Sequence, residues 1–139
     1  MTTTRTKHTI SDEGAKQVLA AAEAKARAID VPMVIAVLDD GGHLSAFLRM
    51  DGAPIPSIGV ATDKAWTAAG FGLPTDQWYD AIKDEPQLLH GVGAVPRFML
   101  MGGGYPLQQD GQTIGAIGVS GGSYQQDMEV AQAGVAALG

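Results

Sequence analysis

The chain has 139 residues, no cysteine and a net charge of −6 from nine Lys and Arg against fifteen Asp and Glu. This length fits one domain, the missing cysteines exclude thiolate catalysis, disulfides and iron–sulfur clusters, and the acidic balance predicts no nucleic-acid or anionic-membrane partner. Neither a signal-peptide core nor an apolar run of membrane-spanning length is present, so we expect a cytoplasmic protein without a membrane partner.

The N-terminal residues predict an arm followed by a helix. Residues 1–10 are polar and rich in Thr, and we separate them as a loose arm from a single domain over residues 11–139. Ser11 precedes two acidic residues, a pattern typical of a helix N-terminus. Apolar residues then recur at helical spacing, and the helix is expected to end before Pro32.

A β-hairpin is predicted next. Residues 33–39 form an apolar run of strand length, residues 39–42 supply turn chemistry, and residues 43–50 alternate between apolar and other side chains. The alternation sends Arg49 to the sheet face opposite the leucines.

The middle of the chain predicts two helices and then an irregular connection. Ser57 is expected to cap a helix that reaches Phe71, and Lys64 lies at the margin of its apolar stripe. A short helix follows Thr75. Proline and glycine in residues 84–96 favour an irregular connection.

The last third predicts two or three strands and a capped helix. Residues 97–119 are interrupted by a triple glycine and by an Asp-Gly pair, and Ser123 lies three residues before Gln126, as in a capping box. One face of this helix is expected to contain Tyr124, Met128, Ala131, Val135 and Leu138. The order of elements predicts an α/β (α+β) fold with a five-stranded, largely antiparallel sheet and flanking helices.

The stretch from Gly118 to Gly122 matches the G-x-S-x-G pattern of a hydrolase nucleophile elbow. In that fold the histidine follows the serine, but no histidine follows His90, so we do not predict a nucleophilic Ser120. Two interpretations remain. The glycines allow a helix to pack closely on the strand, or Gly118, Ser120, Gly121 and Gly122 bind a ligand carboxylate at the N–H groups of the next helix.

Few cations remain for chemistry beyond the first helix. Arg49 ends a strand and Lys64 lies on the next helix, so both are candidate ligand-binding residues in one pocket, suited to a carboxylate or a propionate. The alternative is a salt bridge from Arg49 to Asp51 or Asp63, with Lys64 extended along the surface. In an enzyme, Lys64 or Asp51 would be the catalytic acid or base.

The three histidines lie far apart in the sequence, and we predict no metal cluster. A haem iron needs only one axial side chain, so His43 in the hairpin turn or His90 in the irregular connection is a candidate haem ligand. An ordinary solvated turn explains His43 equally.

Four further motifs are VLDDGGHLSAFLRMDGA, DKAWTAAGF, GGGYPL and GAIGVSGGSYQQDMEVAQAGVAAL. Together they resemble the GlcG and HbpS-like family of haem-degrading or haem-binding proteins, and the resemblance runs from Ile10 to Leu138. It implies a profilin-like or PAS-like domain and a homo-oligomer. It also implies haem binding in some members, and in others a place beside genes for catabolism of glycolate, diols or aromatic compounds. The residues that match are Arg49, Asp51, Gly52, Lys64, Gly103, Gly104, Pro106 and Gly115–Gly122.

Three hypotheses follow. The first is an oligomeric protein that binds a small molecule, with haem as a possible cofactor. The second is a cofactor-independent enzyme of a catabolic pathway acting on a small carboxylate-bearing substrate, and the third is an assembly module without a ligand. Alanine-rich faces on the helix before Phe71 and on the last helix predict a dimer or higher oligomer, with the pocket near a subunit boundary.

Overall fold

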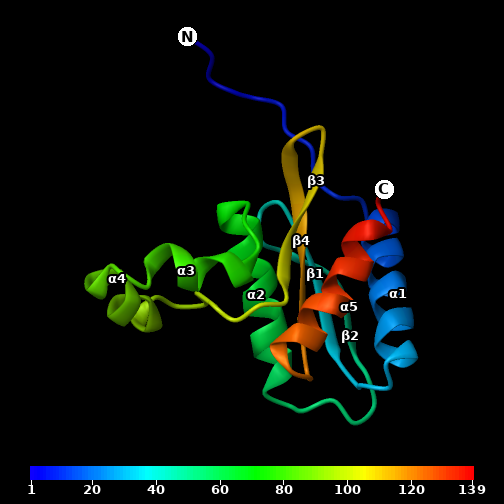
Figure 1. The fold of residues 1–139 in the computed structure, drawn as a ribbon. Coiled ribbons are helices and arrows are strands. Elements are labelled where there is room, and N and C mark those ends of the chain that lie inside the picture. Colours follow the sequence, from blue (N-terminus) through cyan, green and yellow to red (C-terminus); the bar gives the residue numbers. More distant parts are fainter.

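A four-stranded sheet with helices on both faces forms the body of the protein (Figure 1). The computed structural model describes all 139 residues. The strands are β1 (Val34–Asp39), β2 (Leu44–Arg49), β3 (Gly104–Gln109) and β4 (Gln112–Ser120). Their order is β2-β1-β4-β3, and every neighbouring pair is antiparallel, so β2 and β3 are the two edges.

Three long helices cover the sheet. The helices α1 (Asp12–Ala28) and α5 (Tyr124–Ala136) lie side by side on one face, and α2 (Ser57–Phe71) lies on the other (Figure 1). Between α2 and β3 the chain forms η1 (Thr75–Gln77), α3 (Trp78–Ile82), α4 (Pro86–Gly91) and η2 (Val92–Ala94). Residues 78–94, the protruding segment, extend away from the sheet, and α4 has no buried residue. None of the helices combines the length and the apolarity needed to span a membrane.

The core explains why the first strand is a continuous apolar run. Ile35 and Val37 belong to the large cluster formed with α1 and α5, whereas Val34, Ala36 and Leu38 pack toward α2. A strand that is buried on both faces has no polar side to alternate with. The predicted hairpin is confirmed, and β1 pairs with β2 from Val34 to Leu38.

The predicted five-stranded sheet is wrong, because the segment before β3 does not form a strand. Arg97 has a positive φ of 67°, which breaks an extended run. Phe98 packs edge-on against the rings of Phe71 and Trp78, and the Met99 N–H donates to the Thr67 hydroxyl at 3.0 Å. The Thr67 hydroxyl also donates to the Arg97 carbonyl at 2.9 Å, so backbone groups that a fifth strand would use for pairing are bonded to a side chain of α2.

Two of the three predicted serine caps are confirmed. Ser11 accepts a hydrogen bond from the Gly14 N–H, and Ser123 forms a complete capping box with Gln126. Ser57 does not cap α2, because the cap position is Pro56 and the Ser57 hydroxyl instead accepts a hydrogen bond from Ser120. The expected irregular connection is also partly wrong, because it contains α4 and η2.

The end of the N-terminal arm contacts the body. Ile10 is buried, and its N–H donates to the Ile114 carbonyl at 2.9 Å. The Lys7 ammonium lies 2.8 Å from the Asp40 carboxylate. The contact with Lys7 lowers the pKa of Asp40. The arm is therefore attached at the β4 and hairpin end of the sheet.

Gly118 allows α2 to pack directly on β4. A Cβ atom placed there would collide with the Ala61 carbonyl oxygen and would lie 2.6 Å from the Ala65 nitrogen, and both are backbone atoms that cannot turn aside. The close helix packing expected from this glycine is confirmed. The layer of side chains between α2 and the sheet is consequently thin, and alanines line it.

We expect Gly118→Ala to lower the free energy of unfolding by about 2–3 kcal/mol, because the added methyl group must displace the α2 backbone. Gly59→Ala is the matched control. Gly59 lies on the same helix with open space around it, so alanine there should be neutral or stabilising by up to about 1 kcal/mol. Urea denaturation of both variants measures the difference, and equal stability of the two would contradict the close packing.

Candidate functional site

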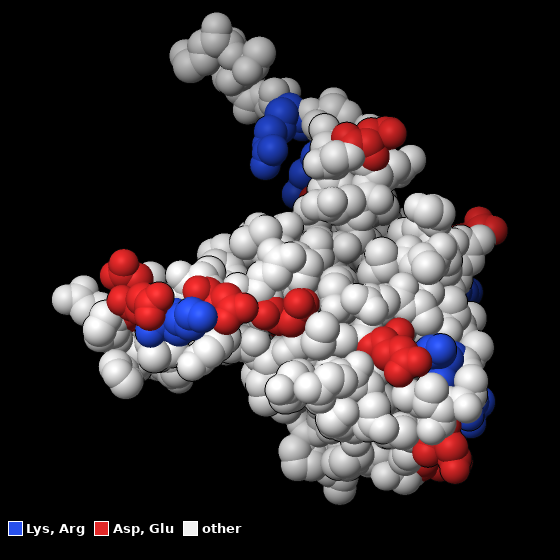
Figure 2. Space-filling view, in the orientation of Figure 1, with Lys and Arg blue, Asp and Glu red and all other residues white.

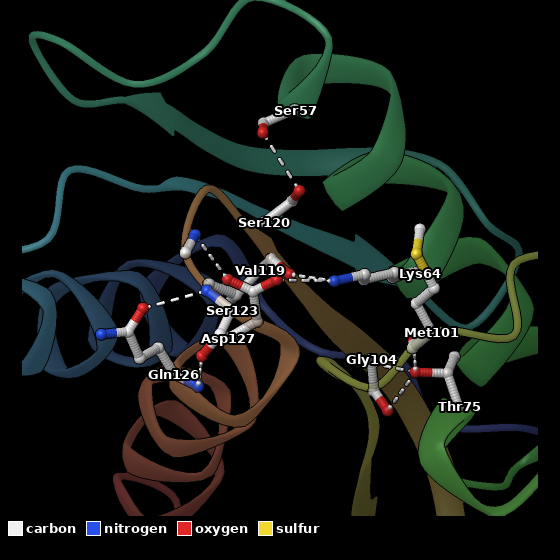
Figure 3. Close-up of polar contacts among 11 residues, drawn as sticks. Ser57, Lys64, Thr75, Met101, Gly104, Val119, Ser120, Ser123, Gln126 and Asp127 are labelled. Atoms are coloured by element: carbon white, nitrogen blue, oxygen red, sulfur yellow. Dashed lines mark hydrogen bonds and ion pairs between the residues drawn. The ribbon is translucent and has the colours of Figure 1, made fainter.

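A buried ion pair joins α2 to α5 at the end of β4 (Figure 3). The Lys64 Nζ lies 2.9 Å from the Asp127 Oδ2 and donates to the Val119 carbonyl oxygen, also at 2.9 Å. The two side chains are 1% and 5% exposed. Burial lowers the pKa of Lys64 and raises the pKa of Asp127, while the attraction between the two charges acts in the opposite direction. Each charge therefore depends on the other for its stability.

The Asp127 carboxylate also occupies the N-terminal end of α5. Its Oδ1 accepts a hydrogen bond from the Gly122 N–H at 3.0 Å. The Ser123 N–H donates to the Gln126 Oε1 at 2.9 Å, and the Gln126 N–H donates to the Ser123 hydroxyl at 3.2 Å. Side chains of the protein itself thus take three N–H groups at the helix start, where a ligand carboxylate was one of the two interpretations.

A glycine-rich loop packs on the ion pair. A Cβ atom at Gly103 would lie 2.7 Å from the Val119 oxygen and 2.9 Å from the Lys64 Nζ, and Gly103 has a φ of 126°. On its other side the loop is held by Thr75, whose hydroxyl donates to the Met101 carbonyl at 2.7 Å and accepts from the Gly104 N–H at 2.9 Å. The loop is therefore fixed between the ion pair and η1 (Figure 3).

A cleft of about 430 Å³ opens beside this loop. It lies between the loop, η1 with α3, and the first turns of α5. Its lining residues are Asp76, Tyr79, Asp80, Leu100, Met101, Gly102, Tyr124 and Met128. Tyr79 and Tyr124 are each 57% exposed, so the phenol rings stand at an open mouth. Apolar walls with a few polar groups are typical of small-molecule sites.

One carboxylate oxygen in the cleft lining has no hydrogen-bond partner. Asp76 Oδ1 is buried and accepts no hydrogen bond, and the buried Nε1–H of Trp78, two residues along the chain, donates none. The phenol of Tyr105 accepts a hydrogen bond from the Gln132 side chain at 3.1 Å. Burial, and then the charge of Asp76, raises the pKa of Tyr105 to about 12. The cleft lining contains no Lys or Arg, so its charged groups are acidic.

The structure does not form the predicted pocket between Arg49 and Lys64. Arg49 is exposed on the edge strand β2, and β1 separates it from β4, where the Lys64 ammonium binds. Lys64 is on the buried face of α2 rather than at its margin. The alternative salt bridge to Asp63 is also wrong, because Asp63 pairs with Arg97 at 3.0 Å. Asp51 lies exposed in the turn after β2, away from Lys64.

The remaining predicted site residues lie outside the cleft lining. His43 is 81% exposed in the hairpin turn, with its Nδ1 3.2 Å from the Asp39 carboxylate, and His90 lies on α4. Ser120 is buried and donates to the Ser57 hydroxyl at 3.1 Å, and no histidine contacts it in the hydrogen-bond network. Their roles in binding stay predictions. The structure has no group of three His, Cys, Asp or Glu side chains that could hold a metal ion.

The sequence matches the family described as haem degrading protein HbpS-like over residues 10–136. This chain belongs to the HbpS-like family. The predicted resemblance is confirmed. A 15.0 kDa protein encoded in the dhaT-dhaS intergenic region of Citrobacter freundii is 38% identical over 126 residues, which are 89% of this HbpS-like chain and 88% of that protein.

Solved structures support the same assignment. The protein ORFY of Klebsiella pneumoniae is 35% identical, covers 99% of this chain and 95% of its own, and has a TM-score of 0.92. A structure described as a PduOC complex with haem is 33% identical, with 93% of this HbpS-like chain and 94% of that chain covered and a TM-score of 0.83.

We expect Lys64→Met to lower the free energy of unfolding by about 3–5 kcal/mol, because it leaves the buried Asp127 charge without a partner. In the double variant Lys64→Met/Asp127→Asn the loss should be smaller than the sum of the two single losses. Urea denaturation of the four proteins measures this coupling.

Lys25→Met is the matched control for the buried pair. Lys25 pairs with Glu129 at 3.1 Å and also joins a helix to α5, but both side chains are well exposed. This change should cost less than about 1 kcal/mol. A Lys64→Met loss no larger than that of Lys25→Met would show that the buried pair does not stabilise the protein.

Proposed function

We propose that this protein binds haem in the cleft and acts as a cytoplasmic haem-handling protein of the HbpS-like family. The observation that carries the proposal is the similarity to the PduOC complex with haem over 93% of the chain. The apolar cleft of about 430 Å³ supports it, because haem needs an apolar slot and one axial side chain.

The cleft residues fit the body of haem. Leu100 and the thioethers of Met101 and Met128 supply apolar surface for a macrocycle, and the phenols of Tyr79 and Tyr124 are of a type that ligates haem iron. When bound, haem would supply a redox-active iron. Because the cleft lining holds carboxylates and no cation, the propionates would face the open mouth and the solvent.

Two residues singled out from the sequence, Lys64 and Gly118, stabilise the cleft in this proposal but do not contact the ligand. Lys64, through its pairing with Asp127, keeps the loop at Gly103 in place, and Gly118 keeps α2 close to the sheet. The alternative of a cofactor-independent enzyme gains no support from the geometry. Lys64 is sealed from solvent, and Arg49 is not beside it to orient a substrate carboxylate.

We further propose a homo-oligomer, but not on the alanine-rich helix faces from which the sequence predicts it. The alanines of α2 cannot supply the interface, because Ala61, Ala65 and Ala68 are fully buried against the sheet. The protruding segment supplies a better reason. Leu88 within it and Val95 directly after it are about half exposed. Helices as short as α3 and α4 are not stable alone in water. Since α3 also lines the cleft, a partner on this segment would place the cleft near a subunit boundary.

Titration of the purified protein with hemin should produce a Soret band that saturates near one haem per chain or per dimer. Tyr124→Ala should weaken the affinity by about tenfold or more, because it removes one aromatic wall of the cleft. Leu44→Ala is the matched control. Leu44 has similar exposure but lies on β2, outside both the cleft lining and the protruding segment, so its variant should bind hemin as the wild type does.

Histidine variants decide between the cleft and the histidines as the source of the iron ligand. His43→Ala and His90→Ala should leave the Soret position unchanged if the ligand comes from the cleft. A shifted Soret band in either variant would identify that histidine as the iron ligand. Absorbance that rises without saturation in the wild type would contradict specific haem binding altogether.

Light scattering at micromolar concentration should report a mass at least twice the 14.4 kDa of one chain. Leu88→Glu should lower that mass, because it places a charge on the protruding segment where the partner is expected to pack. A wild-type mass that stays near 14.4 kDa would rule out both the oligomer and a shared cleft.

A further inference from the structure

The unpartnered oxygen of Asp76 requires a physical explanation. Buried polar atoms in folded proteins almost always have a hydrogen-bond partner, and a carboxylate oxygen without one costs free energy. Asp76 Oδ1 is buried without a donor, and Asp76 is among the residues that line the cleft. A donor that enters the cleft from outside would remove this cost.

The other cleft residues favour a positively charged donor. Asp80 follows Asp76 by one helical turn and lines the same cleft, and no Lys or Arg neutralises either carboxylate there. Acidic side chains also dominate the protruding segment next to the cleft (Figure 2). Two phenol rings at the mouth, two thioethers, Leu100 and Gly102 complete the lining. Aromatic faces attract cations and thioethers pack against apolar or aromatic groups.

We propose that the cleft binds an organic ammonium ion, whose N–H donates to Asp76 Oδ1 and whose aromatic or alkyl body lies between Tyr79 and Tyr124. The proposal rests on the proposed function only in taking the cleft as the ligand site, and it does not require haem. Both ligands would contact the phenols and thioethers of the cleft, but only the amine uses its carboxylates, Asp76 and Asp80. The ligand class is a primary amine with a compact apolar body.

The test is a ¹H–¹⁵N NMR titration of the full chain with 2-phenylethylammonium and, separately, with 3-phenylpropionate. The two probes share a phenyl ring and a short alkyl chain but carry opposite charges. The ammonium ion should shift the amide signals of Met101, Gly102 and Tyr124 in a saturable manner. The carboxylate should bind at least about tenfold more weakly, because it meets two like charges.

Asp76→Asn keeps the shape of the side chain and removes the charge, so ammonium affinity should fall by about tenfold or more. Asp84→Asn is the matched control, since Asp84 is exposed on the same segment but does not line the cleft. This control should bind the ammonium ion as the wild type does. If Asp76→Asn fails to fold, Tyr124→Ala provides the second variant and should also weaken binding.

Equal affinity for the two probes, or unchanged ammonium affinity in Asp76→Asn, would overturn the proposal. The same protein sample titrated with hemin separates this result from the haem proposal. Saturating hemin without ammonium binding leaves haem in the cleft and rejects the amine. Ammonium binding without hemin binding supports the amine proposal and rejects haem binding. If both bind, the ammonium ion should displace hemin, and simultaneous binding would show that the two ligands do not share the cleft.

Discussion

The ion pair between Lys64 and Asp127 fixes the region around the cleft. Removing two charges from water costs several kcal/mol for each charge, and only close contact with good hydrogen bonding compensates for it. The pair meets this condition by adding the Val119 carbonyl as a second partner for Lys64 and the Gly122 N–H as a second partner for Asp127. As a result α2 and α5, which lie on opposite faces of the sheet, are held in one arrangement with the end of β4.

The ion pair also positions the cleft, because the glycine-rich loop that lines the cleft packs on the pair. Gly103 can pack on the Lys64 ammonium only because it has no side chain, and Thr75 holds the other side of the loop. The residues that reach the cleft from the loop are thereby set against α3 and α5. A rigid support of this kind is what a binding site requires, since loosely held groups lose affinity. The acidic side chains of the cleft, Asp76 and Asp80, come from a separate segment, η1 and α3.

Local sequence patterns predicted most of the elements and two of the three serine caps. The hairpin followed from a strand-length apolar run before Asp-Asp-Gly-Gly, and the capping box of α5 followed from residues three apart, because both are decided by neighbours in the chain. The predicted fifth strand failed for a different reason. Residues 97–103 have an apolar composition, but Phe98 packs with two aromatic rings and Met99 bonds to Thr67, and neither partner is a neighbour in sequence. The predicted face of α5 is confirmed where Ala131, Val135 and Leu138 pack in or against the core, whereas Tyr124 and Met128 at its start line the cleft. The burial of Asp127 was not predicted.

The sequence by itself determined the family, the lack of thiol chemistry, the hairpin, and the need for a close approach at Gly118. It also singled out Lys64, but as a candidate ligand-binding residue in one pocket with Arg49. Only the tertiary structure decided that Lys64 meets Asp127, 63 residues away, and that Asp76 lines a cleft with groups from two other segments. The physical reason is that composition and spacing report on neighbours within a helix or strand. Which distant charge a buried charge meets is decided by how the helices pack across the sheet.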